Sequence, residues 1–401
     1  MRISNNQLFY RALNGMLGLQ EDIQTYQTQV SSGKRLLKSA DDPVAAAQSL
    51  NLTDRLSALK QFDRNANLAN LRLSEQESSI DATQNTLQRV RELIVRAKNG
   101  SLTTADRRFI AIEVGERLNE ALNLANKKNS SGEFIFAGTA VATQPFTKDA
   151  AGTVAYNGNQ SVRELEIAEG RTLGEGLSGA EAFMALRNGN GTFVANLNPA
   201  NSGTGRITDG SVVNVAAFTT DNFQINFTAP TTYDVVNTTT GATVLSAQPY
   251  TDGAAINFNG ISVAVTGRPA LGDQFAIGPS QNQSVFATIA KAQTDMSVDP
   301  TSPKLNANLA FNLERALGDI DQAVDGLSAV RAQIGARQNA LDSQTNINAD
   351  VTVQLENVRG KLEDVDMASA ISHLTRQTQA LEAAQQAFVR VEGLSLFNFL
   401  R

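Results

Sequence analysis

The chain of 401 residues contains no cysteine, no tryptophan and a single histidine. Without cysteine there can be no disulfide, thiol nucleophile, iron–sulfur cluster or cysteine-ligated zinc, and one histidine cannot form a multi-histidine metal site. The lone His373 lies between Ile371 and Leu374 with no acid and nucleophile arranged around it. We therefore expect no cofactor, no metal and no catalysis.

Charge of one sign and long apolar runs are also scarce. The formal net charge of -6 and a pI near 5.1 give the whole chain no electrostatic reason to bind nucleic acid. No run of 18 apolar residues is present, which predicts no membrane insertion. The first residues are too polar for a cleavable signal peptide, so we expect either a cytosolic protein or export by another route.

Helix breakers and the negative charge are concentrated in the middle of the chain. Residues 139–300 contain 7 of the 9 prolines, 17 of the 29 glycines, 7 basic and 13 acidic residues. The flanks hold the remaining 27 basic and 27 acidic residues. The composition thus predicts two neutral helical flanks around an acidic segment that is rich in loops.

Apolar residues of the N-terminal flank recur with alternating gaps of three and four, which is typical of paired helices. The first such stripe consists of Phe9, Ala12, Met16, Leu19, Ile23, Tyr26 and Val30. After a break at Ser31-Ser32-Gly33, Asp42 and Pro43 fit an N-cap and a first helical residue, and they predict a second helix that ends at Asn99-Gly100. At 1.5 Å per residue such a helix would be about 75 Å long, which predicts a rod. We expect a third helix over about 104–128.

The C-terminal flank repeats this pattern. Ser302-Pro303 predicts a helix start, polar residues interrupt the stripe from Gln338 to Asn348, and the phase slips at Asp366-Met367-Ala368-Ser369. A final helix carries the stripe Ile371, Leu374, Leu381, Phe388 and Val391, and an apolar end follows with Leu394, Leu396, Phe397, Phe399 and Leu400. Because chain ends are usually polar and frayed, we expect this one to be buried by assembly with other subunits.

The middle segment alternates apolar with polar residues, as half-buried strands do. Residues 223–227, 256–258 and 261–265 show this alternation, and Asn259-Gly260 predicts a type I′ hairpin turn. The expected fold is therefore α+β: an elongated helical coiled-coil rod formed by both flanks, with an inserted antiparallel, sandwich-like β domain.

Three short motifs have structural explanations. Asp41-Asp42 could bind calcium, but a helix cap explains it without further assumptions. The basic stretch Lys34-Arg35-Leu36-Leu37-Lys38 is better explained by solvation or subunit pairing than by nucleic acid. Asn51-Leu52-Thr53 matches a glycosylation acceptor inside a predicted helix, where the match is coincidental.

Both ends of the chain resemble those of bacterial flagellins. Ser32-Gly33-Lys34-Arg35-Leu36 and Ser39-Ala40-Asp41-Asp42-Pro43 carry the N-terminal resemblance, and residues 381–388 with 394–400 carry the C-terminal one. Within this family, residues 132–139 (Gly-Glu-Phe-Ile-Phe-Ala-Gly-Thr), Gln144-Pro145-Phe146 and Tyr156-Asn157-Gly158 look more like the hook-associated branch at the hook–filament junction, the FlgL type, than like filament flagellin. Residues 256–263 and 272–275 resemble a β module that is found in both branches.

The resemblance implies an extracellular ring of subunits between the hook-associated zone and the filament, exported by the flagellar type III route. It implies as partners copies of the chain itself, the neighbouring hook-associated protein, flagellin, and a cytosolic export chaperone at the C-terminal helix. It also implies an inner layer from residues 1–40 and 370–401, a helical rod from 41–140 and 281–369, and an outer β domain from 141–280.

Two other functions are weighed against this one. The first is a filament flagellin, which would polymerise into long filaments. The second is an adhesive or glycan-binding surface protein, which the middle segment supports poorly because it has no tryptophan and only Tyr156, Tyr233 and Tyr250 as tyrosine stacking platforms. The sequence favours the junction protein, with the two terminal stripes as its assembly surface.

Overall fold

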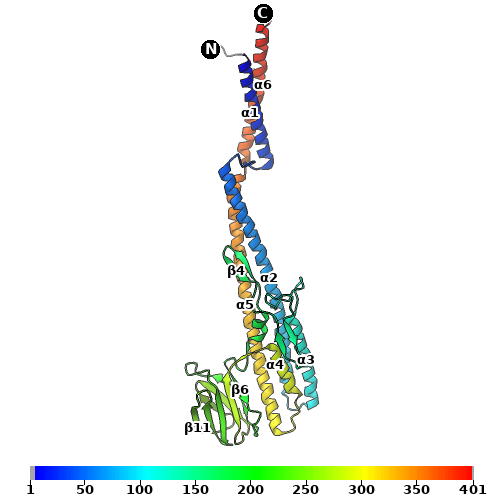
Figure 1. The fold of residues 1–401 in the computed structure, drawn as a ribbon, viewed down its shortest axis with the longest axis vertical. Coiled ribbons are helices and arrows are strands. Elements are labelled where there is room, and N and C mark those ends of the chain that lie inside the picture. Colours follow the sequence, from blue (N-terminus) through cyan, green and yellow to red (C-terminus); the bar gives the residue numbers. More distant parts are fainter. Residues whose placement is uncertain (1–4, 400–401) are drawn as a thin grey trace. The chain divides into compact units, whose positions relative to one another are not determined.

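The computed structural model describes the backbone of residues 5–399 and the side chains of residues 7 and 9–390. The chain forms two compact units (Figure 1), and they are treated separately below. Unit 1 comprises Met1–Arg64 and Ser343–Arg401, and unit 2 comprises Asn65–Asp342. The α-helices are α1 (Asn5–Ser32), α2 (Pro43–Ala97), α3 (Thr104–Ala125), α4 (Val285–Ser297), α5 (Pro303–Glu363) and α6 (Met367–Phe399).

The helices begin where local capping chemistry favours it. The Oδ1 of Asp42 accepts a hydrogen bond from Ala45 N at 3.0 Å, directly before α2. Thr103 and Asp106 form a reciprocal capping box at the start of α3. Ser302 Oγ accepts from Leu305 N at the start of α5, as Ser302-Pro303 predicted. The boundaries expected near residues 43, 104, 303 and 367 are confirmed.

The end of α3 differs from the expectation. The helix stops at Ala125 and not near Lys128. Asn126 leaves the helix because its side chain pairs with the backbone of Phe146, accepting from Phe146 N and donating to Phe146 O, both at 2.9 Å. A contact with a residue 20 positions further along the chain therefore overrides local helix propensity.

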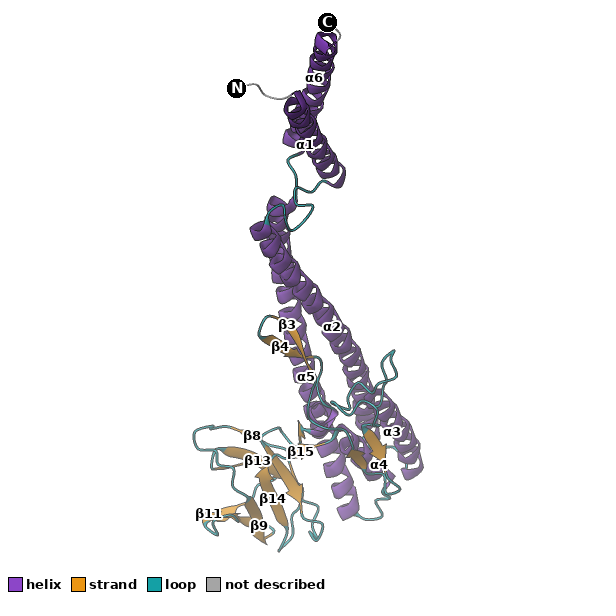
Figure 2. Ribbon diagram, turned by 45° about the horizontal axis from the view of Figure 1, so that its top comes forward, coloured by secondary structure: helices purple, strands orange, loops and turns teal. Residues whose placement is uncertain are grey.

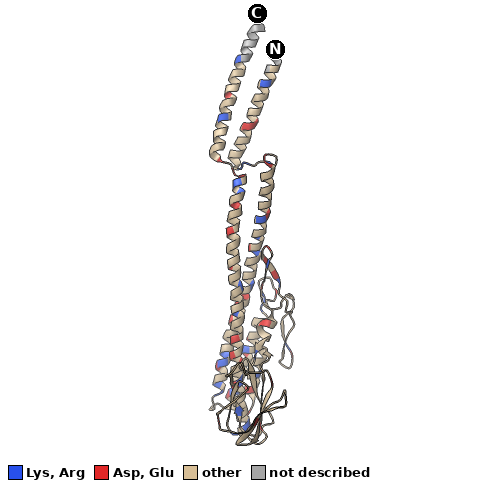
Figure 3. Cartoon of the chain, turned by 90° about the vertical axis from the view of Figure 1, so that its left-hand side faces the viewer, with Lys and Arg blue, Asp and Glu red and all other residues tan. Residues whose placement is uncertain are grey.

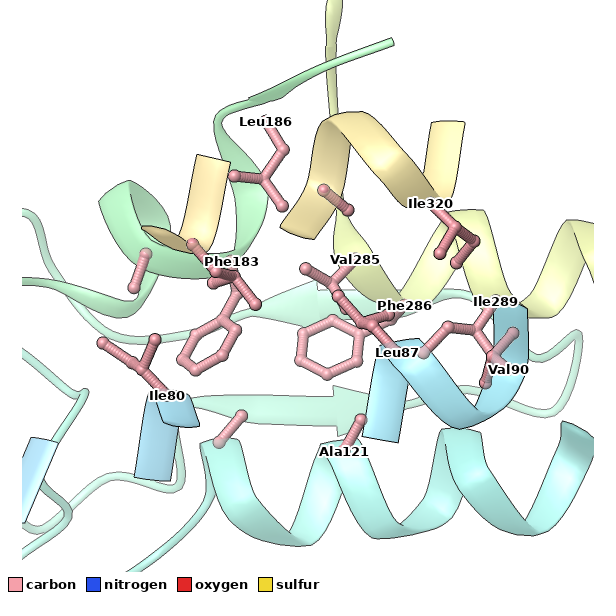
Figure 4. Close-up of a cluster of buried hydrophobic side chains, with 14 of the residues drawn as sticks. Ile80, Leu87, Val90, Ala121, Phe183, Leu186, Val285, Phe286, Ile289 and Ile320 are labelled. Carbon is pink, nitrogen blue, oxygen red and sulfur yellow. The ribbon is translucent and has the colours of Figure 1, made fainter. Parts of the chain in front are cut away.

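The helical part of unit 2 has a continuous apolar core from α2, α3, α4 and α5. Figure 4 shows Leu87 and Val90 of α2 facing Val285, Phe286 and Ile289 of α4. Two residues that the three-and-four spacing of residues 313–334 also predicts, Leu317 and Val324, are only half-buried against this core. The other residues at this spacing in these helices are almost fully buried: Ala66, Ala69, Leu73, Ile80, Leu87, Val90, Ile94, Ile110, Val114, Leu118, Ala121, Ala125, Leu313, Ile320, Leu327 and Ile334.

The motifs of the family resemblance build an aromatic cluster at the side of this core. The rings of Phe136 and Phe183 lie 4.8 Å apart, and Phe146 contacts Tyr156, Phe183 and Phe286 at centroid distances of 5.1–5.6 Å. The Tyr156 hydroxyl donates toward Phe136 O and Asn159 O, at 3.0 and 2.8 Å. The motifs at residues 132–139, 144–146 and 156–158 thus pack together into one loop region beside the helical core.

Strands occupy the remainder of unit 2 (Figure 2). They are β1 (Phe146–Lys148), β2 (Val154–Tyr156), β3 (Glu164–Ala168), β4 (Arg171–Gly174), β5 (Leu186–Arg187), β6 (Phe193–Leu197), β7 (Arg206–Ile207), β8 (Ser211–Val212), β9 (Phe223–Ala229), β10 (Thr232–Asn237), β11 (Thr243–Pro249), β12 (Ala255–Phe258), β13 (Ile261–Thr266), β14 (Gln274–Pro279) and β15 (Asn282–Gln283). A short π-helical turn lies at Ala180–Met184.

Two antiparallel sheets enclose a second apolar core. One has the order β11-β10-β9-β14-β6, and the other has β12-β13-β7 with β8 also pairing with β13. Phe223 of the first sheet contacts Phe258 of the second at a centroid distance of 5.2 Å. The expected hairpin is confirmed: Phe258 pairs with Ile261, and Asn259 and Gly260 have φ values of 41° and 76°. The predicted α+β class with an inserted antiparallel β domain is correct.

Unit 1 contains the paired helices α1 and α6, the start of α2 and the end of α5. Among its described side chains, the buried apolar residues are only Ala45, Leu56 and Ala370. The polar interruption of the stripe is also buried here: Gln344 donates to Asn348, and Asn348 donates to Asp63 Oδ1 at 3.2 Å. Such a polar pair within a helix interface favours one register over others.

Candidate assembly interface

Helices α1 and α6 pair in antiparallel fashion in unit 1. The rings of Phe9 and Phe388 lie 5.4 Å apart near one end of the pair, and those of Tyr26 and His373 stack at 5.3 Å with an angle of 7° near the other. Between them, Gln377 Nε2 donates to Asp22 Oδ2 at 3.3 Å. The pairing therefore uses the faces that carry the two sequence stripes.

The expected stripe of α1 faces its partner helix but remains half-buried. Ala12, Met16, Leu19, Ile23, Tyr26 and Val30 all have intermediate exposure. Phe9, at the open end of the pair, is 39% exposed. One partner helix therefore covers only part of the stripe.

One described residue of the expected α6 stripe, Ile371, does not lie on the covered face. Leu374, Leu381 and Phe388 are half-buried, but Ile371 is 48% exposed and Ala370 is 3% exposed. At the start of α6, Ala370 is buried and His373 stacks on Tyr26, and Ile371 lies on another side of the helix. The side chains of Val391, Leu394, Leu396, Phe397 and Phe399 lie outside the described residues, as does Leu400 altogether.

A second set of apolar residues on the pair points away from the partner helix. Tyr10 and Leu17 of α1 are 62% and 53% exposed, and Val389 of α6 is 69% exposed. Figure 3 shows that charged residues are few along the described parts of the two helices that lead to the chain ends. We name Leu17, Ile371 and Val389 the outward apolar set. These side chains are about half exposed or more in the single chain.

The loop between α1 and α2 is ordered by its own carboxylates. Asp41 Oδ2 accepts from Leu37 N and Lys38 N, both at 2.9 Å, and these backbone hydrogen bonds lower the pKa of Asp41. Asp42 caps α2, and Pro43 is the first residue of that helix. Asp42 thus acts as the expected helix cap, whereas Asp41 orders the loop before the helix.

The same loop clamps the end of α5. Lys34 Nζ lies 3.0 Å from Glu363 Oε2 and 2.7 Å from Asp364 Oδ1, and its pKa is raised by the hydrogen bonds to Asp364 and then Glu363. Arg35 donates to Leu362 O at 2.8 Å, a favourable position for a cation at a helix C-terminus. A hydrogen bond from Ser49, then one from Lys34, lowers the pKa of Glu363.

The basic stretch therefore contributes an intramolecular contact that sequence reasoning missed. We expected Lys34 and Arg35 to be solvated or to pair with another subunit, and the structure pairs them with residues 362–364 of the same chain. Sequence spacing gave no signal for this, because Lys34 and Asp364 are 330 residues apart. Lys38 and Leu36 instead line an open groove beside Leu50.

A second polar cluster that sequence analysis did not identify lies in unit 2. Arg72 and Arg163 both pair with Glu133 and Glu175, and Arg163 Nε lies 2.5 Å from Glu175 Oε1. Glu133 belongs to the motif at residues 132–139, so this motif is anchored to α2 through Arg72. The four charges neutralise one another, which indicates a structural role.

Catalytic and metal sites are not indicated by these contacts. The described residues contain no cluster of three or more His, Asp or Glu side chains that could hold a metal ion. None of the described helices is long and apolar enough to cross a membrane. His373 packs flat against Tyr26 in the helix pair.

Paired terminal helices that flank an inserted β module define a protein of the flagellin class. The family model for the bacterial flagellin N-terminal helical region matches residues 3–141, and the one for the C-terminal helical region matches residues 317–400. The resemblance found in the two sequence ends is therefore confirmed.

Individual relatives narrow the class to one branch. The flagellar hook-associated protein 3 of Escherichia coli (strain K12) is 24% identical over 99% of each chain. The crystal structure of Xanthomonas campestris FlgL is 34% identical, covers 77% of this chain and 99% of its own, and has a TM-score of 0.68. That of the flagellar junction protein FlgL from Legionella pneumophila is 30% identical, covers 78% and 100%, and has a TM-score of 0.70. The chain belongs to the FlgL family of flagellar hook-associated proteins.

Proposed function

We propose that this chain is a structural junction protein of the bacterial flagellum, which links the hook-associated zone to the flagellin filament through its terminal helices. The observation that carries the proposal is the incompletely covered helix pair of unit 1. Its inner stripe is half-buried, and its outward apolar set is about half exposed or more. Apolar surface of this kind is stabilised by burial against neighbours. A relative named a flagellar junction protein supports the same role.

The proposed partners are copies of this chain in a ring, the neighbouring hook-associated protein, and flagellin. Residues 1–40 and 370–401 would form the inner layer, residues 41–140 and 281–369 the helical part, and residues 141–280 the outer β domain. The protein would be extracellular and exported by the flagellar type III route. Before assembly, an export chaperone would cover the C-terminal helix.

The proposed assembly residues divide into two kinds. The inner stripe of α1, with Leu374, Leu381 and Phe388 of α6, holds the two helices together. Ile371, exposed in the single chain, belongs with Leu17 and Val389 on the surface offered to a neighbour. The apolar residues at 391–400 are proposed to join that surface on assembly.

A deletion strain tests the function. Cells that lack this chain are expected to release flagellin into the medium and to carry no attached filaments, because the filament has no junction to grow from. Attached filaments without released flagellin would contradict the proposal. A flagellin is distinguished by polymerisation: the purified junction protein should add a limited layer to seeds, whereas flagellin should extend long filaments.

A matched pair of variants tests the assembly surface in the same strain. Ile371→Gln removes an exposed apolar contact and should reduce motility and attached filaments while leaving export unchanged. Ser372→Gln, at the neighbouring exposed position, should restore the wild-type phenotype. Equal behaviour of the two variants would show that Ile371 makes no assembly contact.

A further inference from the structure

An open groove of about 570 Å³ lies on the outer face of the five-stranded sheet. Its floor is formed by β9, β14 and β6, which are neighbours in that order. Phe275 and Ile277 of β14 point into the core, so Ala276 and Gly278 between and beside them face outward. The groove is thus separate from the apolar core of the β module and from unit 1.

The strand register gives the groove a small-residue floor between polar walls. Gln224 of β9 and Asn196 of β6 both lie opposite Ala276 of β14. Two residues further along β14, a Cβ atom on Gly278 would lie 2.7 Å from Asn222 Oδ1. Ala276 therefore leaves room that a longer side chain on β14 would fill, whereas the Asn222 side chain already occupies the position beside Gly278.

Side-chain amides without internal partners gather around this space. Within the described part of the chain, the amide groups of Asn222, Gln224 and Gln281 and the Nδ2 of Asn196 make no hydrogen bond to the protein. On the same face outside the groove, Asn198 and Gln274 satisfy each other at 2.9 Å. The groove is therefore a local concentration of free donors and acceptors.

The one charged residue that lines the groove, Arg315, lies beside an acidic residue, Asp319. Arg315 reaches the groove from α5 and donates to Asn196 Oδ1. Its Nε lies 3.8 Å from Asp319 Oδ2, and the Asp319 side chain is 2% exposed. A buried carboxylate thus offsets the guanidinium charge, so the groove offers donors without a strong net attraction for anions.

The combination points to a neutral polyhydroxylated ligand. An amide presents a donor and an acceptor side by side, which matches adjacent sugar hydroxyl groups. The groove volume lies in the range of small-molecule sites. The Phe223 ring is 1% exposed, so stacking contributes nothing. We propose that this groove binds a neutral saccharide of two or three sugar units, with a Kd on the order of millimolar because hydrogen bonds exchanged with water give little net affinity.

Ligand-observed saturation-transfer NMR on the full chain tests this proposal. The neutral probes are cellotriose, maltotriose and mannotriose, and lactose is compared with 3′-sialyllactose to separate neutral from anionic recognition. At least one neutral trisaccharide should give a saturable signal in the millimolar range. Absence of a saturable signal from all neutral probes would overturn the proposal, as would binding of 3′-sialyllactose alone.

Substitutions locate the signal. Ala276→Leu places a large side chain on the exposed floor and should weaken binding at least tenfold, and Gln224→Ala should weaken it roughly fivefold, as expected for one hydrogen-bonding side chain. Ser246→Leu on β11, exposed and outside the groove, is the matched control and should bind as wild type. Equal binding by Ala276→Leu and wild type, with unchanged thermal unfolding of both, would overturn the assignment.

Discussion

Unit 1 and unit 2 both contain long stretches of helix with three-and-four apolar spacing, yet they bury these residues to different degrees. In unit 2, Leu73, Ile80 and Leu87 of α2 are fully buried, because α3, α4 and α5 cover several sides. In unit 1, the equally regular stripe of α1 is only half-buried against α6. The same sequence pattern thus yields a core where the chain supplies enough neighbours, and an incomplete interface where it does not.

This comparison predicts a large difference in local stability. In the purified single chain, backbone amides of residues 1–40 and 370–401 should exchange with solvent roughly a thousandfold or more faster than those of α2 within unit 2, since little apolar burial opposes their opening. Hydrogen exchange with mass spectrometry measures this. The fast region should become protected on assembly. Equal protection of both regions in a verified monomer would remove the distinction between the units.

Matched leucine substitutions sharpen the comparison energetically. Leu87→Ala in the core of unit 2 should lower the free energy of unfolding by about 2–5 kcal/mol, because a fully buried side chain leaves a cavity. Leu19→Ala in the half-buried stripe should cost the single chain less than about 1 kcal/mol. Urea unfolding followed by circular dichroism gives both values. A Leu19→Ala cost as large as that of Leu87→Ala would show that unit 1 has a core of its own.

The smallest expected effect is the pH dependence of folding stability, which should have opposite signs in the two units. Glu363 in the loop clamp of unit 1 has a pKa lowered from 4.5, so its contribution is present above pH 4.5 and is lost as the pH falls through the folded pKa. In unit 2, burial raises the pKa values of Asp209 and Asp319 from 3.8, and the charge of Asp319 further raises that of Asp209. Their charged forms disfavour folding at neutral pH, and acidification through the folded pKa relieves this.

Two variants separate these signs. Asp209→Asn should stabilise unit 2 at pH 7 by roughly 0.5–1 kcal/mol, and it should reduce the stability that unit 2 gains on acidification. Lys34→Met should cost unit 1 less than about 1 kcal/mol, since the Lys34 side chain is 43% exposed and solvent screens its ion pairs, and should make its clamp less sensitive to acid. Hydrogen exchange of two backbone amides reports on the two sites. The Gly189 amide donates to Asp319 at 2.8 Å in unit 2, and the Arg35 amide donates to Glu363 O at 2.6 Å in unit 1. Parallel pH trends at the two amides would contradict the assignment.

Local chemistry made several elements predictable. Asp42-Pro43 and Ser302-Pro303 marked helix starts because caps act within four residues. Asn259-Gly260 marked a hairpin because only a few residue types accept positive φ at both turn positions. The buried faces of α2 and α3 in unit 2 followed from periodicity alone.

Other features depended on distant residues and could not be anticipated. The end of α3 is set by Asn126 pairing with Phe146, and the position of the basic loop by Lys34 pairing with Glu363 and Asp364. At the start of α6, Tyr26 of α1 stacks on His373, and Ile371 is 48% exposed although it fits the stripe. The amide groove required the register of three strands from separate parts of the chain.

The sequence by itself determined the helical flanks, the β insert and membership of the flagellin class, because periodicity, capping residues and turn residues act over short distances. Only the tertiary structure decided how many neighbours each apolar stripe receives. That number depends on which segments meet in space: α2 meets three helices in unit 2, whereas α1 pairs with α6 in unit 1. The same three-and-four spacing therefore gives a closed core in unit 2 and a half-buried helix pair in unit 1.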